Sequence, residues 1–598
     1  MVAKANCRKG RPRKQRATPT NNNEKSTDST DSPKQILDTK SKQVPELTAD
    51  LKEKLEKEYF STPQLLSYNP WHSTTANGSR NSYNPEVKFM HFNGMTKQYK
   101  AKFKASSFGF TNFFSPDIKE TSPKKKYNAL PQFSNLVPNC VEEPLDASTF
   151  QSRVPLSSTF DLRVNANSLV KLARNSNLKF PKDESMRNGC VLNCGGLSIT
   201  SVWFDKKLTS DKRNVHYLLL SVMPTKQASP SKLSSTDLKM LSLTDFTSFE
   251  SALIIYRYDT DEQLLQPIKN LLTPHGAIVE MNLLSSSNTK SSLIACVNSD
   301  GTTSVIKVDE SFLKGPRYSK LVKPSASLFF TAEDLSLKIL CCTWTSSQTI
   351  VVGTTEGCIA EFDINDTSRP LYILPLHVPS VLAVQSDYGT DLYGSGPCRY
   401  RSDNVFLSSG DLNVFLLDLN DSERVIEGPK FRIPVSNVYY SSLLNGFLYI
   451  DGTRTLKYST VRDSSTTLKI RVYDEPPQSV GCCDYSPLVI TGCSNGDVRL
   501  LNICNHISQP LKSENAASLR IYKLATVREG SDQFQLNLGY SVDRTDEPTT
   551  EYHPYENSLT VTSCSMMNRP DTNNIIFTSY ANGLIIAEQL QDVKQEYK

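Results

Sequence analysis

From about residue 190 to the C-terminus, short apolar runs alternate with polar turns at a regular spacing. Each unit consists of an apolar strand, a gap, a second strand, a glycine-containing turn and a third strand. Asn-Gly and Asp-Gly between apolar runs favour type I′ hairpins, because both central positions of that turn need positive φ. The aligned turns are Val297–Gly301, Gly353–Gly357, Leu407–Asp411, Gly492–Asp497 and Thr578–Gly583.

The strands before these turns repeat as well. Ile339–Trp344 corresponds to Val480–Tyr485, and Cys341 and Cys482 are 141 residues apart, which is three periods of about 47 and close to the period of a propeller blade. An irregular first blade is expected from Ser201–Asp205, Tyr217–Met223 and Ala252–Tyr258. Equivalent strands are expected at Ile278–Leu283, Val381–Val384, Val438–Tyr440 and Thr560–Ser565.

These repeats predict an all-β fold, a seven-bladed β-propeller over residues 186–595. A single four-stranded sheet cannot bury both of its faces, whereas a closed ring of sheets buries every face and protects the edges. The pattern resembles divergent WD40 repeats. It lacks their Gly-His and terminal Trp-Asp dipeptides, so the hydrogen-bond network that those residues form is doubtful here.

The N-terminal third has a different pattern. Residues 1–46 are polar without an apolar period and are expected to be a disordered basic tail. Residues 47–185 are expected to be an irregular extension that begins with a short helix at 47–60, where Leu47, Leu51, Leu55 and Tyr59 recur every four residues.

A second basic patch falls within this extension. Lys97, Lys100, Lys102 and Lys104 alternate with aromatic and small residues, as in a strand with one cationic and one apolar face. Interleaved cations and aromatics can bind nucleic acid by phosphate contact and base stacking. The alternative is an extension that packs on the body with its lysines in solvent.

The first residues carry the clearest indication of a partner. Seven Lys and Arg and no acids occur in residues 1–16, although the whole chain has a formal net charge of only +5. Around Gly10 and Pro12 this segment resembles an AT-hook, in which glycine lets the backbone approach a groove floor and proline directs the flanking cations. The predicted DNA-binding residues are Arg8, Lys9, Gly10, Arg11, Pro12, Arg13, Lys14 and Arg16.

Arg11 would enter the narrow minor groove of A·T-rich DNA, whose negative potential attracts arginine. The alternative is a nuclear-import signal, since short Lys/Arg runs commonly serve that purpose. Both interpretations place the protein in the nucleus.

No catalytic or metal-binding pattern is found. The chain has no phosphate-binding loop, no nucleophile elbow and no His-Glu-x-x-His pair. Cys190 and Cys194 are four residues apart without a second pair, so a zinc site is not expected. No secretory leader, transmembrane helix, disulfide framework, cofactor or small-molecule substrate is expected either.

The hook-like tail, the extension and the divergent propeller together resemble the WD-repeat subunit of the RNA polymerase III factor TFIIIC, called tau in yeasts. Ile575–Ile586 carries part of this resemblance, as a strand, an Asn-Gly turn and a second strand. The resemblance implies a non-enzymatic nuclear subunit that pairs with a large winged-helix subunit to recognise B-box promoters. The alternative is a chromatin scaffold or reader whose propeller binds histone or regulator peptides.

Overall fold

The computed structural model describes residues 137–590, with gaps at 157, 166, 182–186, 205–213, 225–248, 285–290, 331–336, 377, 389–401, 403, 429, 432–434, 436, 442–445, 452–453, 462, 484–487, 504–515, 517, 528–531, 540, 544–556, 569–571 and 573. Residues 1–58 form a unit separate from residues 59–598, so all described residues belong to the second unit. The predicted tail and the predicted helix at 47–60 lie outside the described residues. None of the helices in the described part is long and apolar enough to cross a membrane.

The described strands form seven hydrogen-bonded sheets, and four of these are regular four-stranded antiparallel sheets. Within each of these four sheets the spatial order of the strands is their order along the chain. The first sheet contains β10 (Ile278–Leu284), β11 (Ser292–Asn298), β12 (Thr303–Val308) and β14 (Ala326–Leu328). The second contains β15 (Ile339–Trp344), β16 (Thr349–Thr354), β17 (Cys358–Asp363) and β18 (Tyr372–Pro375). The third contains β19 (Val381–Ser386), β20 (Asn404–Ser409), β21 (Val414–Asp418) and β22 (Asp421–Glu427). The fourth contains β23 (Val438–Ser441), β24 (Gly446–Ile450), β25 (Thr455–Thr460) and β26 (Asp463–Val472).

The other three sheets carry additional strands. One contains β6 (Leu197–Phe204), β7 (Val215–Met223), β8 (Ser251–Asp259), β9 (Leu264–Thr273), β13 (Tyr318–Lys323) and β1 (Val141–Pro144). Another contains β27 (Pro477–Cys482), β28 (Leu488–Cys493), β29 (Asp497–Asn502), β30 (Ser518–Thr526), β31 (Gln533–Asn537), β32 (Ser541–Asp543), β2 (Phe160–Val164) and β3 (Val170–Leu172). The last contains β33 (Val561–Met566), β34 (Ile575–Tyr580), β35 (Leu584–Gln589), β5 (Asn188–Asn193) and β4 (Asn177–Lys179). Short helices are α6 (Ala147–Arg153), α8 (Glu310–Lys314) and the 3₁₀ turn η3 (Asn557–Leu559).

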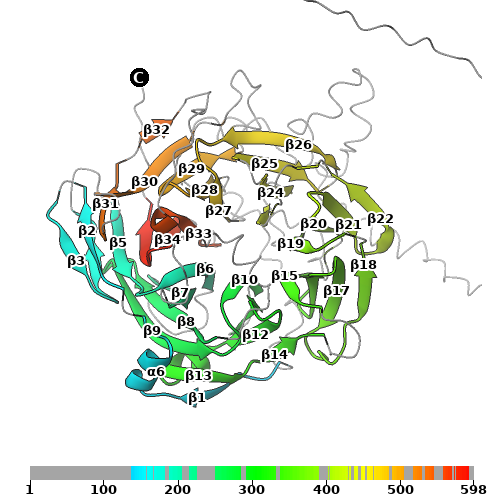
Figure 1. Ribbon diagram of the computed structural model, residues 1–598, viewed down its shortest axis with the longest axis horizontal. Helices are drawn as coiled ribbons and strands as arrows, with labels where there is room; N and C mark the ends of the chain where they lie inside the picture. Colours follow the sequence, from blue (N-terminus) through cyan, green and yellow to red (C-terminus); the bar gives the residue numbers. More distant parts are fainter. Residues whose placement is uncertain are drawn as a thin grey trace, which may run out of the picture. The chain divides into compact units, whose positions relative to one another are not determined.

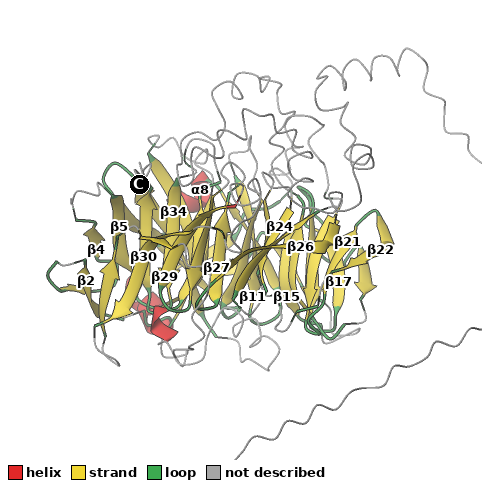
Figure 2. Cartoon of the chain, turned by 90° about the horizontal axis from the view of Figure 1, so that it is seen from above, coloured by secondary structure: helices red, strands yellow, loops and turns green. Residues whose placement is uncertain are grey.

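The sheets are arranged as a ring around a central axis (Figure 1). The first strand of each sheet is innermost, and these strands contact one another in the order β6, β10, β15, β19, β23, β27, β33 and again β6. Seen from the side, the strands run across the thickness of the ring (Figure 2). The ring is closed by β5, which comes early in the chain and pairs antiparallel with the C-terminal strand β35.

The apolar sequence pattern explains this packing. Strands β11, β15, β28 and β34 are buried at every position, because each blade lies between two others and has no solvent-facing side. The hydrophobic clusters accordingly join neighbouring blades, and one of them combines Leu448 and Tyr458 with Val489 and Leu501. Burial of apolar surface on both faces of each sheet is therefore the main stabilising contribution.

The all-β class and the WD40-like propeller architecture are thus confirmed. Hairpin turns are present at the predicted positions, with Gly301, Gly357, Gly496 and Gly583 at φ of 88°, 69°, 81° and 89°. The predicted type I′ geometry is wrong, because the residue before each of these glycines does not have positive φ. The first blade is irregular, as expected: β6 to β9 are long paired strands whose register shifts in the β6–β7 and β8–β9 pairs, and two further strands extend their sheet. The sequence pattern does not reveal β9 because Gln266 and Lys269 interrupt its apolar run.

The C-terminal part of the predicted N-terminal extension, which the structure describes from residue 137, also pairs with these sheets. Strand β1 pairs with β13, β2 pairs in parallel with β31, and β4 pairs with β5. Helix α6 begins at Asp146, whose side chain accepts a hydrogen bond from the Thr149 backbone N–H at 2.7 Å. Residues 141–179 therefore add outer strands to three of the sheets.

Candidate protein-interaction site

The predicted DNA-binding residues Arg8 to Arg16 and the lysines of the second basic patch, Lys97 to Lys104, lie outside the described residues. Their roles stay predictions. The described part of the chain offers a different candidate site, the central channel of the ring and the loops around it.

The channel contains a cavity of about 320 Å³ between the inner strands. Its lining comes from six of these strands and includes Thr200, Gln385, Tyr439, Gln478 and Met566. The seven inner strands carry a single charged residue, Glu280 on β10. The other lining groups are hydroxyls, amides and apolar side chains, so the described lining of the cavity holds no cation with which to bind a phosphate.

Polar groups along the channel connect one inner strand to the next. Asn282 Nδ2 donates to the Cys342 carbonyl at 2.7 Å and to Glu280 Oε1 at 2.8 Å. The Ser201 and Ser563 hydroxyls are 2.7 Å apart and join the first and last blades. These contacts satisfy buried polar groups and fix the ring, which leaves an arrangement suited to binding and without a nucleophile paired to a base.

Two buried thiols, Cys190 on the outer strand β5 and Cys194 just after it, are protonated. Burial raises the pKa of Cys190 to about 12 and that of Cys194 to about 11. Since only the thiolate binds zinc, these two cysteines are poorly suited as metal ligands. Within the described residues, no group of three or more His, Cys, Asp or Glu is placed to hold a metal ion.

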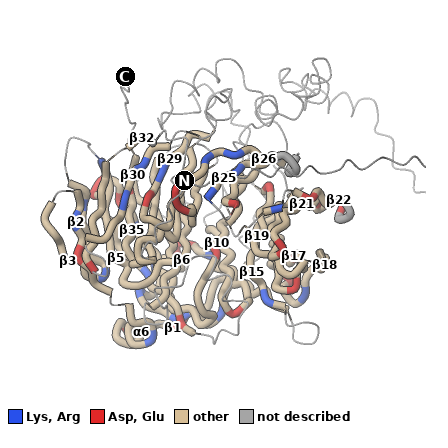
Figure 3. Tube along the Cα trace, turned by 45° about the horizontal axis from the view of Figure 1, so that its top comes forward, with Lys and Arg blue, Asp and Glu red and all other residues tan. Residues whose placement is uncertain are grey.

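Charged side chains lie on the outer strands and turns. Figure 3 shows Lys and Arg interspersed with Asp and Glu around the ring. Several of these charges are paired within the fold: Arg499 Nη2 is 3.0 Å from Asp497 Oδ2, and Lys457 Nζ is 3.3 Å from Asp451 Oδ2. The body therefore shows mixed charge on its surface, as expected from its near-neutral composition.

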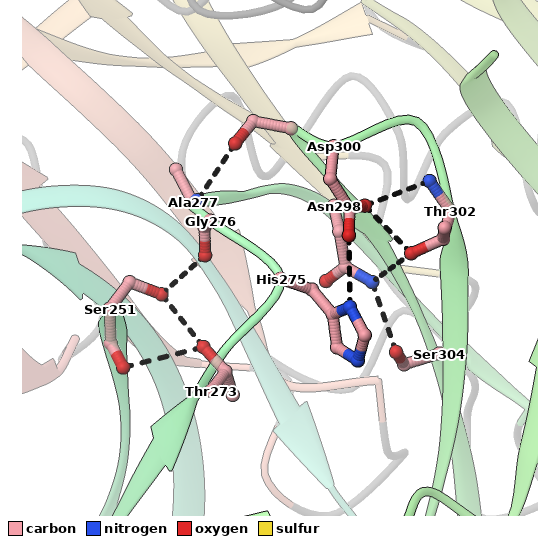
Figure 4. Close-up of polar contacts among 10 residues, drawn as sticks. Ser251, Thr273, His275, Gly276, Ala277, Asn298, Asp300, Thr302 and Ser304 are labelled. Atoms are coloured by element: carbon pink, nitrogen blue, oxygen red, sulfur yellow. Dashed lines mark hydrogen bonds and ion pairs between the residues drawn. The ribbon is translucent and has the colours of Figure 1, made fainter. Parts of the chain in front are cut away.

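A polar network fixes the loop that enters β10 (Figure 4). His275 Nδ1 lies 2.9 Å from Asp300 Oδ2, in the turn between β11 and β12. The other oxygen, Asp300 Oδ1, accepts from the Thr302 backbone N–H at 3.0 Å and from its hydroxyl at 2.7 Å. The Ser251 hydroxyl donates to the Gly276 carbonyl at 2.7 Å. The network thus ties the loop between the first two blades to the following turn.

This network corrects the expectation drawn from the missing dipeptides. The order here is His275-Gly276, the reverse of the Gly-His dipeptide, and the histidine still reaches the turn aspartate. The sequence pattern does not predict this contact, because His275-Gly276 does not match the Gly-His order that is typical of WD40 repeats. A WD40-like His–Asp contact is therefore present in this blade.

The closing strand is held by a buried ion pair that the sequence pattern does not reveal. Arg187, next to β5, donates from Nε and Nη2 to the two carboxylate oxygens of Glu588 on β35, at 2.8 and 2.6 Å. Tyr522 also donates to Glu588, and its ring lies 4.9 Å from the Arg187 guanidinium. A charged residue at the end of the apolar run Leu584–Ala587 is the available indication of this pair.

The closed ring of antiparallel sheets, its early closing strand and the His–Asp contact define a WD40-like β-propeller without a recognisable catalytic constellation among its described residues. No family model matches the chain. Over 367 residues it is 20% identical to the transcription factor tau 91 kDa subunit of Saccharomyces cerevisiae. The match covers 60% of this chain and 51% of the yeast protein, so it spans about half the length of that relative. The resemblance to the TFIIIC subunit predicted from the sequence is confirmed.

Proposed function

We propose that this chain is a non-catalytic nuclear subunit of a TFIIIC-type transcription factor, with a seven-bladed propeller as its protein-binding body. The observation that carries the proposal is the similarity to a subunit of transcription factor tau, together with the propeller fold. In this proposal the propeller pairs with a large winged-helix subunit that recognises the B-box, and other subunits of the factor bind around it.

The distribution of charge suggests separate roles for the propeller and the N-terminal tail. The inner strands offer one carboxylate and no cation, so DNA binding is assigned to the N-terminal tail rather than to the channel. A single hook binds weakly, with a Kd on the order of 10⁻⁴ to 10⁻⁶ M for a few phosphate contacts. Held in a complex on DNA, the tail would act at an effective concentration near millimolar, and selection of the gene would come from the partner.

Affinity purification at native salt tests the assignment to this complex. We expect stable recovery of the chain with a large DNA-binding subunit, and enrichment of tRNA genes in chromatin bound by the complex. Recovery with histones or histone-modifying enzymes, without tRNA genes, would instead support a chromatin scaffold or reader and would refute the proposal.

The tail is tested by replacing Lys9, Arg11 and Arg13 with alanine. We expect weaker binding to A·T-rich duplex and a salt slope lower by about 0.9 for each phosphate that the variant no longer neutralises. A matched control removes the same charge elsewhere in the tail, with Lys25, Lys34 and Lys40 replaced by alanine, and should bind nearly as the original chain does. If the first variant keeps its affinity and slope but fails to enter the nucleus, the segment is an import signal and the hook is wrong.

A further inference from the structure

The outer edge of one regular blade exposes apolar side chains. Strand β18 is the last strand of its sheet; Leu371 immediately precedes it and Ile373 lies within it, and their side chains are 59% and 44% exposed. An exposed apolar edge strand promotes aggregation, and folded proteins generally cover such edges. A segment that covers this edge is therefore expected.

The exposed pair lies over the interface with the preceding blade. Ile373 is directly opposite Ala360 on β17, so the two side chains share a face of the sheet. Ala360 and Phe362 belong to the hydrophobic cluster between this blade and its neighbour, where the Phe330 and Phe362 rings are 5.5 Å apart. Leu371 and Ile373 therefore extend that cluster outward, beyond β17.

The described chain begins in the same cluster. Val137 is 2% exposed and packs among residues that include Leu328 on β14 as well as Ala360 and Phe362. Its carbonyl accepts a hydrogen bond from Lys307 Nζ on β12 at 3.0 Å. In Figure 1 the blue segment before β1 runs toward β14. Val137, the first described residue, is thus buried at the interface between these two blades, which Leu371 and Ile373 extend outward.

The sequence before Val137 matches this exposed apolar edge in chemistry. Tyr127, Leu130, Phe133 and Leu136 recur every third residue, around Pro131. An extended polyproline-type chain has three residues per turn, so this spacing would place all four on one side. Ten residues span at most about 35 Å, which is enough to cross the outer strands of a blade.

We propose that residues 127–136 dock across the outer strands β14 and β18 and cover Leu371 and Ile373 with their apolar side chains. Strands β1, β2 and β4 already show this chain adding its own N-terminal segments to the outer edges of other blades. Docking would also fix the point from which the N-terminal arm leaves the propeller.

Photo-crosslinking of the full chain tests the docking. With Ile373 replaced by photoreactive p-benzoylphenylalanine, we expect adducts within residues 127–136 of the same chain, identified by mass spectrometry. The matched control places the reagent at Val425 on β22, which is 42% exposed on the edge of another blade and should give no such adduct. Adducts to a second copy, adducts to another segment, or no adduct would each overturn the proposal.

Variants in the segment provide the second arm. Replacing Leu130 and Phe133 with aspartate should lower the yield of this adduct at least about tenfold, since two buried apolar side chains are removed. Replacing the intervening Gln132 and Ser134 with aspartate should leave the yield within about twofold. An unchanged yield in the first variant would overturn the proposal, and so would an equal fall in both variants, because charge rather than apolar contact would then govern the crosslink.

Discussion

At the scale of single residues, one turn of the propeller departs from the others. Gly301, Gly357, Gly496 and Gly583 occupy the positive-φ position of their turns, and in the equivalent turn after β20 this position is Leu412, at φ 74°. The equivalence is shown by hydrogen bonds: the Leu412 N–H donates to the Ser409 carbonyl as the Gly301 N–H donates to that of Asn298. A left-handed conformation costs a residue with a Cβ roughly 1–2 kcal/mol.

Leu412→Gly should therefore stabilise the protein. We expect the free energy of unfolding to rise by about 0.5 kcal/mol, since relief of backbone strain exceeds the packing energy of a half-buried side chain and the added entropy of the unfolded chain. Denaturant unfolding followed by fluorescence measures the change. The reverse substitution, Gly301→Ala, is the control and should destabilise, because its Cβ would lie 2.6 Å from Lys338 Cβ. A fall in stability in Leu412→Gly would contradict this account.

At the scale of elements, the sequence pattern predicts those strands whose own residues form an apolar run next to a turn. The predicted strand Ile339–Trp344 has the same bounds as β15, because a largely apolar run ends at the polar residues Thr345–Gln348. Strands β1, β2 and β4 are not predicted as parts of the propeller sheets. They are short and partly polar, and their partners β13, β31 and β5 are in two of three cases more than 150 residues away in sequence. Pairing over such a distance leaves no local pattern.

The candidate site is predictable to a similar extent. The sequence repeats predict the apolar inner strands. They also lead us to expect a central channel without catalytic groups. The His275–Asp300 contact does not follow, because the histidine precedes the glycine instead of following it. The Arg187–Glu588 pair does not follow, because ring closure brings together residues from opposite ends of the propeller sequence. The tertiary fold determines which residue pairs with a buried charge, so a single sequence does not identify the partner.

The closing strand depends on the Arg187–Glu588 pair. We expect Glu588→Gln to destabilise the protein by about 3–5 kcal/mol, because the guanidinium stays buried without its charge partner. The double variant Arg187→Met, Glu588→Leu should recover much of this stability, since replacing both partners with apolar groups removes the uncompensated charge. Thermal unfolding of Glu588→Gln, of Arg187→Met and Glu588→Leu as single variants, and of the double variant measures the coupling.

The outer Lys314–Glu310 pair serves as the comparison for that experiment. Its side chains are 74% and 44% exposed, so Glu310→Gln should change stability by less than about 1 kcal/mol. Equal effects at Glu310 and Glu588, or a double variant as unstable as Glu588→Gln, would show that the buried pair does not hold the closing strand.

At the scale of the whole molecule, the propeller buries many cysteine thiols and tyrosine hydroxyls in their protonated, uncharged form. Among the described cysteines most are buried, including Cys190, Cys194 and Cys564. Burial raises the pKa of these three thiols from 9.0 to about 12, about 11 and about 12. Burial also raises the pKa of several tyrosines, Tyr256 and Tyr580 among them. All these groups are protonated in the folded state at neutral pH, where their burial carries no charge penalty.

These shifts predict a loss of stability at alkaline pH. Above about pH 9 the unfolded thiols release their protons while the folded thiols keep them, so the unfolded state binds fewer protons and the free energy of unfolding falls as pH rises. Each thiol contributes a slope of about 1.4 kcal/mol per pH unit, from about pH 9 up to its folded pKa. Cys194→Ala should make the slope of the free energy of unfolding against pH shallower by one proton between pH 9 and about 11.

Val191→Ala is the control for this variant. It should lower the free energy of unfolding equally at every pH, since that fully buried side chain has no proton to lose. Urea unfolding from neutral to alkaline pH gives both slopes, and an unchanged slope in Cys194→Ala would show that this thiol ionises alike in the folded and unfolded chains.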